Sequence, residues 1–143
     1  MKDQRIEEHL QRLNGYILRL RKYSQIDDNE FINDETKIAA AERILQLAIE
    51  TCLNIGNRIL SLAQSDSEIL IPENYSDIFR MLVRLQIIDP DKLENFLKMA
   101  RFRNRLVHIY WNIDSALLHT YLKENISDFE YYFKNIVDYL NRN

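Results

Sequence analysis

Arginine, asparagine, histidine and tyrosine side chains are concentrated in residues 101–111, which read RFRNRLVHIYW. The interval between Glu94 and Asp114 contains no acidic residue but contains several basic ones: Lys98, Arg101, Arg103 and Arg105. Because the whole chain has a formal net charge of −3, this interval is a window of uncompensated positive charge in an acidic protein. We expect a polyanion to bind there, with Arg101 and Arg105 steering its phosphates.

The chemistry that these residue types support is cleavage of a phosphodiester bond. Arginine stays charged and holds a phosphate with two hydrogen bonds, and histidine exchanges a proton near neutral pH. His108 would deprotonate a ribose hydroxyl or protonate the leaving oxygen, while Arg103 would stabilise the anionic phosphorus. Neither step requires a metal ion, so we expect no metal and no other cofactor.

Helical geometry restricts how Arg103 and His108 can meet. At about 100° per residue, Asn104 and His108 lie near each other, but Arg103 and His108 are separated by about 140° around the helix. The two residues converge if the helix ends or distorts near His108, or if they meet across a symmetric dimer. Asn104 falls on the expected inner stripe of its helix, so we expect it to be buried with hydrogen-bond partners.

Hydrophobic spacing predicts two long helices in the first half of the chain. A helix over residues 3–23 has one apolar stripe: Ile6, Leu10, Leu13, Ile17 and Leu20. The polar residues 24–33 are expected to form a loop, after which Asn33 or Asp34 caps a helix that runs to about residue 63. Its apolar stripe repeats every seven residues and is broad enough for the helix to pack within its own chain on one side and against a second chain on the other, so a homodimer is a hypothesis at this point.

The second half is expected to contain shorter helices that carry the motif. Ser76 would cap a helix that stops near residue 88, and Asp89 with Pro90 would start the helix that presents Arg103. Asp114 would cap the next helix, residues 125–128 would interrupt it, and a last helix would end at 141–143. This pattern predicts an all-α fold, an antiparallel bundle of about five helices that forms one domain over residues 1–143.

Composition restricts the cellular context. The chain is 46% hydrophobic with only two Gly and two Pro, which favours helices, and its single cysteine, Cys52, excludes an intramolecular disulfide. Its N-terminus is charged, and no apolar run approaches the roughly 18 residues of a membrane span. We expect a cytoplasmic protein without a membrane partner. A sequence pI of about 5.6 disfavours a histone-like role, because nucleic-acid binding would have to be local.

Other polar residues have structural interpretations beside the functional ones. Glu50, Asn54 and Asn57 fall on or beside the apolar face of the long helix. They are either core polar groups with satisfied hydrogen bonds, which we favour, or the lining of a cleft opposite the motif. Tyr110 and Trp111 would by default be packing aromatics at the end of the bundle.

The motif resembles that of HEPN-domain ribonucleases, in which an arginine and a polar residue are followed, after a short spacer, by a histidine at a helix end. Here these are Arg103, Asn104 and His108. The extension to Tyr110 is similar to HepT, the toxin family of HepT/MntA-type toxin–antitoxin pairs. The similarity also covers LQLAIETCLNIGN in the long helix and YSD at residues 75–77, and so extends over most of the chain.

The resemblance implies functional properties that spacing alone does not provide. HepT-like proteins are homodimers whose two motifs face each other in a cleft, and they act as metal-independent endoribonucleases on mRNA or tRNA. Their partner is an MntA-like nucleotidyltransferase antitoxin that transfers AMP to the motif tyrosine. Carried over to this chain, Arg103 and His108 would be catalytic, Asn104 would be the supporting polar residue, and Tyr110 would accept AMP.

Two alternatives remain open beside a ribonuclease toxin. The chain would be a non-catalytic helical dimer if the motif only binds nucleotide or a nucleotidyltransferase partner. It would be chiefly a substrate if AMP transfer to Tyr110 were its main role. These alternatives differ in whether His108 and Arg103 are needed for toxicity.

Overall fold

The computed structural model describes residues 1–64, 71–108 and 114–143, and the regular structure in these ranges is helical. The expected all-α bundle is therefore confirmed, although the described ranges contain six α-helices rather than about five. A short 3-10 turn, η2 (Pro90–Lys92), precedes the fifth of them. The α-helices are α1 (Gln4–Ser24), α2 (Asp28–Ile32), α3 (Glu35–Ala63), α4 (Tyr75–Arg84), α5 (Leu93–Val107) and α6 (Ser115–Arg142).

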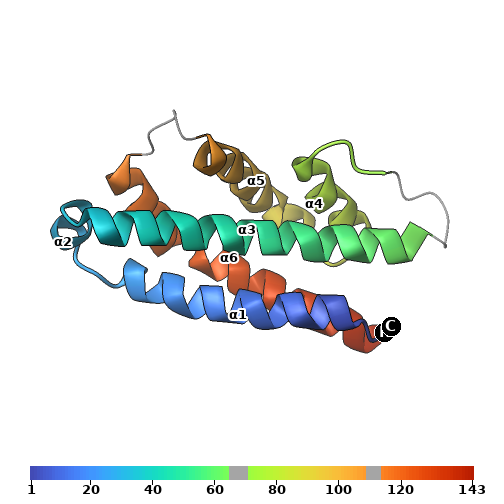
Figure 1. Cartoon of the computed structure of the whole chain (residues 1–143). Coiled ribbons are helices and arrows are strands. Elements are labelled where there is room, and N and C mark those ends of the chain that lie inside the picture. Colours follow the sequence, from blue (N-terminus) through green and yellow to red (C-terminus); the bar gives the residue numbers. More distant parts are fainter. Residues whose placement is uncertain (65–70, 109–113) are drawn as a thin grey trace.

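The long helix α3 is the centre of the bundle. Helix α1 packs against α3 and α6, while α4 and α5 pack on the side of α3 away from α1 (Figure 1). The two termini lie together (Figure 1). The N-terminal amine of Met1 donates a hydrogen bond to the carbonyl oxygen of Leu140 at 2.7 Å. None of the helices in the described ranges combines the length and the apolarity that crossing a bilayer requires.

The broad apolar surface of α3 is covered within one chain. The middle of the expected seven-residue stripe, for example Ala48 and Cys52, is fully buried, and Ile49 and Leu53 beside it are buried too. Only the ends of the stripe, Ile38 and Leu62, are partly buried. Helices α1 and α6 cover one side of α3, and α4 and α5 cover another. The width of this stripe is thus explained without a second chain, and the homodimer remains a prediction.

Helix α2 occupies part of the stretch expected to be a loop. Asp27 caps it by accepting a hydrogen bond from the amide of Asn29 at 3.1 Å. This segment is helical because of a tertiary contact. Phe31 is fully buried and stacks on the ring of His119 from α6, with 4.4 Å between the ring centroids. A polar sequence therefore folds into a helical turn because one aromatic side chain enters the core.

His119 is buried at the junction of α1, α2 and α6. Its Nε2 donates to the carbonyl oxygen of Tyr23 at 3.0 Å, and its Nδ1 lies 2.7 Å from Oδ1 of Asp28. Hydrogen bonds from Lys123 and from His119 hold the pKa of the Asp28 carboxyl below its usual value of 3.8. Both ring nitrogens thus face oxygen acceptors, and His119 has a structural role in joining α2 to α6.

Helix α6 is continuous through residues 125–128, where an interruption was expected. Asn125 and Asp128 are buried, and Nδ2 of Asn125 donates to Oδ2 of Asp128 at 3.0 Å. Asn95 from α5 donates to the other carboxylate oxygen at 3.0 Å. The prediction of two helices was wrong because the Asp128 carboxylate accepts hydrogen bonds from both asparagines inside the bundle, although Oδ1 of Asn125 has no partner among the described residues.

The start and the end of α4 differ from expectation. The cap is Asn74, whose Oδ1 accepts from the amide of Asp77 at 2.9 Å, so Ser76 lies inside the helix. The helix ends at Arg84 because Gln86 adopts a left-handed conformation (φ 62°) and the amide of Ile87 bonds to the carbonyl of Leu82 at 3.0 Å. Asp89 makes no side-chain cap, and Pro90 begins the 3-10 turn rather than α5 itself.

Two glycines in long helices differ sharply in their surroundings. A Cβ atom at Gly56 of α3 would lie 2.6 Å from Cγ2 of Ile78 and 3.1 Å from the hydroxyl of Tyr132, so α4 and α6 approach α3 closely there. That hydroxyl donates to the carbonyl of Cys52 at 2.7 Å, which restricts its movement. At Gly15 of α1 a Cβ atom would meet nothing within 4 Å.

We expect Gly56→Ala to lower the free energy of unfolding by about 1–2 kcal/mol, because overpacking outweighs the gain in helix propensity. The matched change Gly15→Ala should raise it by about 0.5–1 kcal/mol, since only the propensity term acts there. Urea denaturation of both variants measures the difference. Equal effects of the two changes would contradict the close packing of α4 and α6 on α3.

Candidate active site

Arg103 lies where α5, α3 and the start of α4 meet. Its Nη2 is 3.4 Å from Oε1 of Glu50 on α3, and its guanidinium carbon is 4.7 Å from the centroid of the Tyr75 ring at the start of α4. The side chains of Arg103 and Glu50 keep 20% and 31% of their surface exposed. A cation–π contact and a half-buried ion pair therefore hold the guanidinium at the edge of the bundle.

The hydrogen bonds of Arg103 are few and long. Its Nε is buried and has no acceptor among the described residues, and its Nη1 is 3.5 Å from Oδ1 of Asn104. Oε1 of Glu50 also accepts a hydrogen bond from Gln46 at 3.1 Å. The guanidinium is thus positioned mainly by packing, and it can exchange the long contact to Glu50 for the shorter, bidentate contacts that a phosphate offers.

His108 lies at the point where α5 ends. The last helical residue is Val107, and His108 itself has extended backbone angles (φ −91°, ψ 96°). The helix end that would allow Arg103 and His108 to converge is therefore present, and the angle of an unbroken helix no longer separates them. Tyr110 and Trp111, the predicted AMP acceptor and its neighbour, lie outside the described residues.

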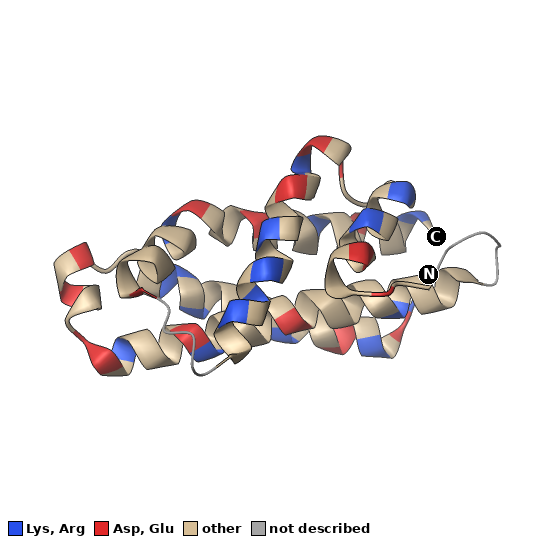
Figure 2. Ribbon diagram, turned by 90° about the horizontal axis from the view of Figure 1, so that it is seen from above, with Lys and Arg blue, Asp and Glu red and all other residues tan. Residues whose placement is uncertain are grey.

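The basic window is compensated in part. Arg101 pairs with Glu94 at 3.0 Å, with both side chains exposed, and Arg103 pairs with Glu50. The expectation of uncompensated charge was wrong because helical spacing brings Glu94 back to Arg101 and tertiary packing brings Glu50 to Arg103. Figure 2 still shows basic positions following one another along α5.

The remaining basic residues of α5 lie on another side of the helix from Arg103. Lys98, Arg101 and Arg105 line a groove of about 260 Å³ between α5 and α6, together with Phe102 and Tyr121. Arg103 instead faces α3 and α4. The structure therefore separates the predicted phosphate-steering arginines from the predicted catalytic arginine.

Asn104 is exposed, so the expectation that it is buried was wrong. The buried face of α5 is formed by Phe96, Met99, Ala100 and Phe102. Phe102 stacks on Tyr121 of α6 at 4.4 Å between ring centroids, and this packing turns Asn104 outward. Asn104 lines the opening of a cavity of about 690 Å³.

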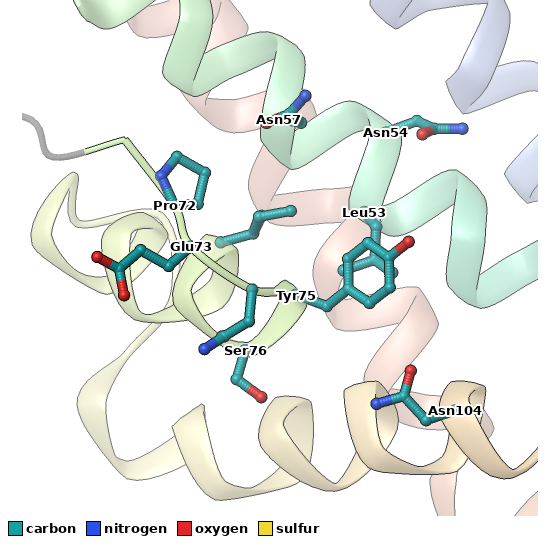
Figure 3. Close-up of a pocket in the computed structure, with 10 residues that line it drawn as sticks. Leu53, Asn54, Asn57, Pro72, Glu73, Tyr75, Ser76 and Asn104 are labelled. Carbon is teal, nitrogen blue, oxygen red and sulfur yellow. The ribbon is translucent and has the colours of Figure 1, made fainter.

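Asn54 and Asn57 are also exposed and line the same cavity (Figure 3). Glu50 and Asn54 line a smaller, neighbouring cavity of about 250 Å³ together with Arg103. The interpretation that we favoured for these α3 residues, satisfied core polar groups, was wrong for Asn54 and Asn57, whereas Glu50 is half-buried and has hydrogen-bond partners. They line a cleft opposite the motif.

Sequence reasoning assigned no part in the site to Tyr75. Tyr75 lies outside the apolar stripe of α4, and packing in the core does not explain an exposed aromatic residue at a helix start. This was a weak indication that Tyr75 belongs to a functional site. Among the described residues, no three side chains of His, Cys, Asp or Glu lie close enough together to hold a metal ion.

The family model "Ribonuclease HepT-like" matches residues 13–136, which include Arg103, Asn104 and His108. The chain belongs to the HepT-like ribonuclease family. The resemblance found in the motif is thereby confirmed over most of the chain. Membership in this family also makes the protein an enzyme, in agreement with the residue types at the site.

Two known HepT-like ribonucleases are similar to this chain along most of their length. The tRNA nuclease HepT of Aphanizomenon flos-aquae is 27% identical over 137 residues, which cover 94% of this chain and 89% of that protein. The mRNA nuclease HepT of Shewanella oneidensis is 27% identical over 104 residues, covering 73% of this chain and 75% of that one.

The fold of this HepT-like ribonuclease agrees with a solved HEPN toxin. The structure of the tri-AMPylated Shewanella oneidensis HEPN toxin in complex with MNT antitoxin superposes with a TM-score of 0.84 at 24% identity. The match covers 96% of this chain and 99% of that chain. The six-helix bundle is therefore HEPN-like.

Proposed function

We propose that this HepT-like ribonuclease is the toxin of a HepT/MntA-type toxin–antitoxin pair and cleaves mRNA or tRNA in the cytoplasm without a metal ion. The observation that carries the proposal is the position of Arg103. Its guanidinium is held against Tyr75, with one long contact to Glu50, on the helix that ends at His108. The two curated relatives, a tRNA nuclease and an mRNA nuclease, support RNA as the substrate.

In the proposed reaction, the neutral imidazole of His108 takes the proton of a ribose 2′-hydroxyl, and the oxygen attacks the adjacent phosphorus. The bond to the 5′-oxygen of the next nucleotide breaks, and that oxygen takes up a proton, which a protonated histidine can supply. Arg103 binds the non-bridging oxygens and stabilises their charge in the transition state. Asn104, beside Arg103, helps to position the guanidinium or the phosphate.

A homodimer is part of this proposal. Two copies that face each other with their α5 helix ends would place two Arg103–His108 sets along one RNA strand, whether each set acts within a chain or across the interface. Arg101 and Arg105 would then bind phosphates outside the cleaved bond. Their exposed side chains suit this role, because a phosphate contact needs a cation on the surface.

We propose that an MntA-like nucleotidyltransferase controls the activity by transferring AMP to Tyr110. The Shewanella structure, in which an AMPylated HEPN toxin is bound to an MNT antitoxin, supports this regulation. A phosphate and an adenosine attached two residues after His108 would repel RNA by like charge and would occupy space beside the site.

The test is incubation of the purified, unmodified protein with total cellular RNA in excess chelator, followed by mapping of the fragment ends. Chelator-resistant cleavage at defined positions supports a metal-independent ribonuclease. RNA that remains intact under these conditions and also with added Mg²⁺ would overturn catalysis and favour the non-catalytic helical dimer.

Tyr110→Phe should abolish incorporation of AMP by the antitoxin, because phenylalanine lacks the accepting hydroxyl. The variant should also escape neutralisation and stop growth when both proteins are produced together. Mass spectrometry of the protein after incubation with ATP and antitoxin measures the modification. Tyr16→Phe, on α1, is the matched control and should be modified as the wild type is; AMP on Tyr110→Phe would mean that another residue is the acceptor.

A further inference from the structure

The cavity that Asn104 borders is lined by an unusual set of side chains. It has a volume of about 690 Å³ and lies between α3, the segment before α4 and the end of α5. Figure 3 shows Asn54 and Asn57 on α3, Asn104 on α5, and the ring of Tyr75 between them. With Asn74, four asparagines line this one cavity, which we call the asparagine pocket.

The chemistry of the asparagine pocket fits a nucleobase better than a phosphate. No lysine or arginine occurs among the described residues that line it, and Glu73 adds a negative charge at its edge. Side-chain amides offer donors and acceptors together, as the edges of bases do, and they pair with bases through both. Leu53, Ile78 and the Tyr75 ring supply apolar surface against which a flat ring can pack.

Most of these amides are available for a ligand. Oδ1 of Asn74 is used in capping α4, and Oδ1 of Asn104 has only the 3.5 Å contact with Arg103. Asn54 and Asn57 are exposed, and no hydrogen bond within the described part of the chain occupies their amides. Several amide groups of the residues that line the pocket are therefore without hydrogen-bond partners among the described residues.

The asparagine pocket continues into the cavity at Arg103. That smaller cavity is lined by Glu50, Leu53, Asn54, Tyr75 and Arg103, and three of these residues, Leu53, Asn54 and Tyr75, line both cavities. A nucleotide whose phosphate is bound by Arg103 would thus have its base within reach of the asparagine pocket. The side chains shared by the two cavities would contact both parts of one nucleotide.

We propose that the asparagine pocket binds one base of the RNA next to the cleaved phosphate and sets the base preference of cleavage. This inference rests on the proposed ribonuclease function and names the subsite that selects its substrate. Asn54 and Asn57 form hydrogen bonds with the base edge, Tyr75 contacts the base and Arg103 together, and Asn104 closes the pocket on the side of α5.

Binding of nucleosides tests the pocket separately from cleavage. Adenosine, guanosine, cytidine and uridine carry bases but no phosphate, so Arg103 does not attract them. Titration to the solubility limit should shift the NMR signals of the Asn57 side-chain amide, which does not line the cavity at Arg103, for at least one nucleoside, whereas ribose 5-phosphate should leave these signals in place. Asn57→Ala should weaken the binding of that nucleoside severalfold.

Cleavage of short RNAs that differ in one base at a time tests the preference. The wild type should favour one base at a fixed position beside the cut, and Asn54→Ala or Asn57→Ala should reduce that preference about fivefold or more. Asn141→Ala, an exposed asparagine in a cavity near the C-terminus, is the matched control and should keep it. Asn141→Ala should also cleave every substrate at the wild-type rate, whereas Asn54→Ala and Asn57→Ala should lose the most rate on the favoured substrate.

The two experiments separate the pocket from the proposed function. If no nucleoside shifts the pocket amides, or if both variants keep the wild-type preference, the inference is overturned. If the wild type leaves every RNA intact, the ribonuclease proposal fails, and the nucleoside titration still decides whether the pocket binds a base.

Discussion

We expect His108→Ala to lower the rate constant of RNA cleavage by about 10²- to 10⁴-fold, because an alanine can neither accept nor deliver the proton. His108 lies at the end of α5 and its backbone has left the helix, so the substitution removes a side chain without interrupting helical hydrogen bonds. The measurement is a single-turnover time course on a short RNA that the wild type cuts, with the fold checked by circular dichroism and thermal unfolding.

His9→Ala is the matched control for this experiment. His9 lies on α1, on the opposite side of α3 from the motif, and its loss should leave the rate constant unchanged. His119 is unsuitable as a control because it is buried and joins α2 to α6. A rate for His108→Ala equal to that of the wild type would assign the proton transfers to another group and would remove His108 from the catalytic set.

Arg103→Ala is expected to lower kcat/KM by about 10²- to 10³-fold, the usual effect of losing a donor that stabilises transition-state charge. Arg103→Lys should recover only part of this loss, since an ammonium keeps the charge but neither binds a phosphate with two parallel bonds nor stacks on Tyr75 in the same way. Steady-state kinetics on the same RNA measures both variants. Arg84→Ala, at the exposed end of α4, is the control and should retain the wild-type kcat/KM.

A double variant separates the catalytic from the structural part of Arg103. Removing the guanidinium leaves the half-buried carboxylate of Glu50 without its cation, which should cost about 1 kcal/mol or less of stability, because the pair is still reached by water. Adding Glu50→Gln to Arg103→Ala should restore that stability but not the activity. If activity returned with stability, Arg103 would act through the fold and not at the phosphate.

The residues at which several helices start could be predicted from the sequence, because helix starts depend on local interactions. Asp114 caps the helix that follows as predicted, and Asp34 is the one of the two predicted candidates, Asn33 and Asp34, that caps α3. Asp3, where the first helix was expected to begin, is its cap. Each carboxylate reaches an amide two or three residues onward, so the information lies within one turn. The long α3 was likewise evident from its stripe.

Segments that are helical only because of contacts with residues distant in the sequence were predicted wrongly. Helix α2 forms because Phe31 packs on His119, a residue far away in the sequence. Helix α6 continues through Asn125 and Asp128 because the buried Asp128 carboxylate accepts hydrogen bonds from Asn125 and from Asn95 of another helix. In both cases a polar segment looked like a loop, and contacts between helices decided otherwise.

The linear motif determined which residues of this HepT-like ribonuclease are candidates for catalysis. Arg103, Asn104 and His108 lie close together in the sequence, and their residue types alone indicate phosphodiester chemistry. Because Arg103 and His108 cannot converge on an unbroken helix, the sequence predicted either a helix end near His108 or a meeting of the two residues across a dimer. The end of α5 at His108 is the first of these arrangements.

Only the tertiary structure decided what surrounds these residues. Spacing gives the angles between side chains about the axis of one helix, but the rotation of that helix against its neighbours is set by packing. Phe102 on Tyr121 sets the rotation of α5, which turns Asn104 outward and brings Arg103 to Glu50 and Tyr75. The asparagine pocket follows from the same packing, because its side chains come from α3, α4 and α5 and meet only when these helices are assembled.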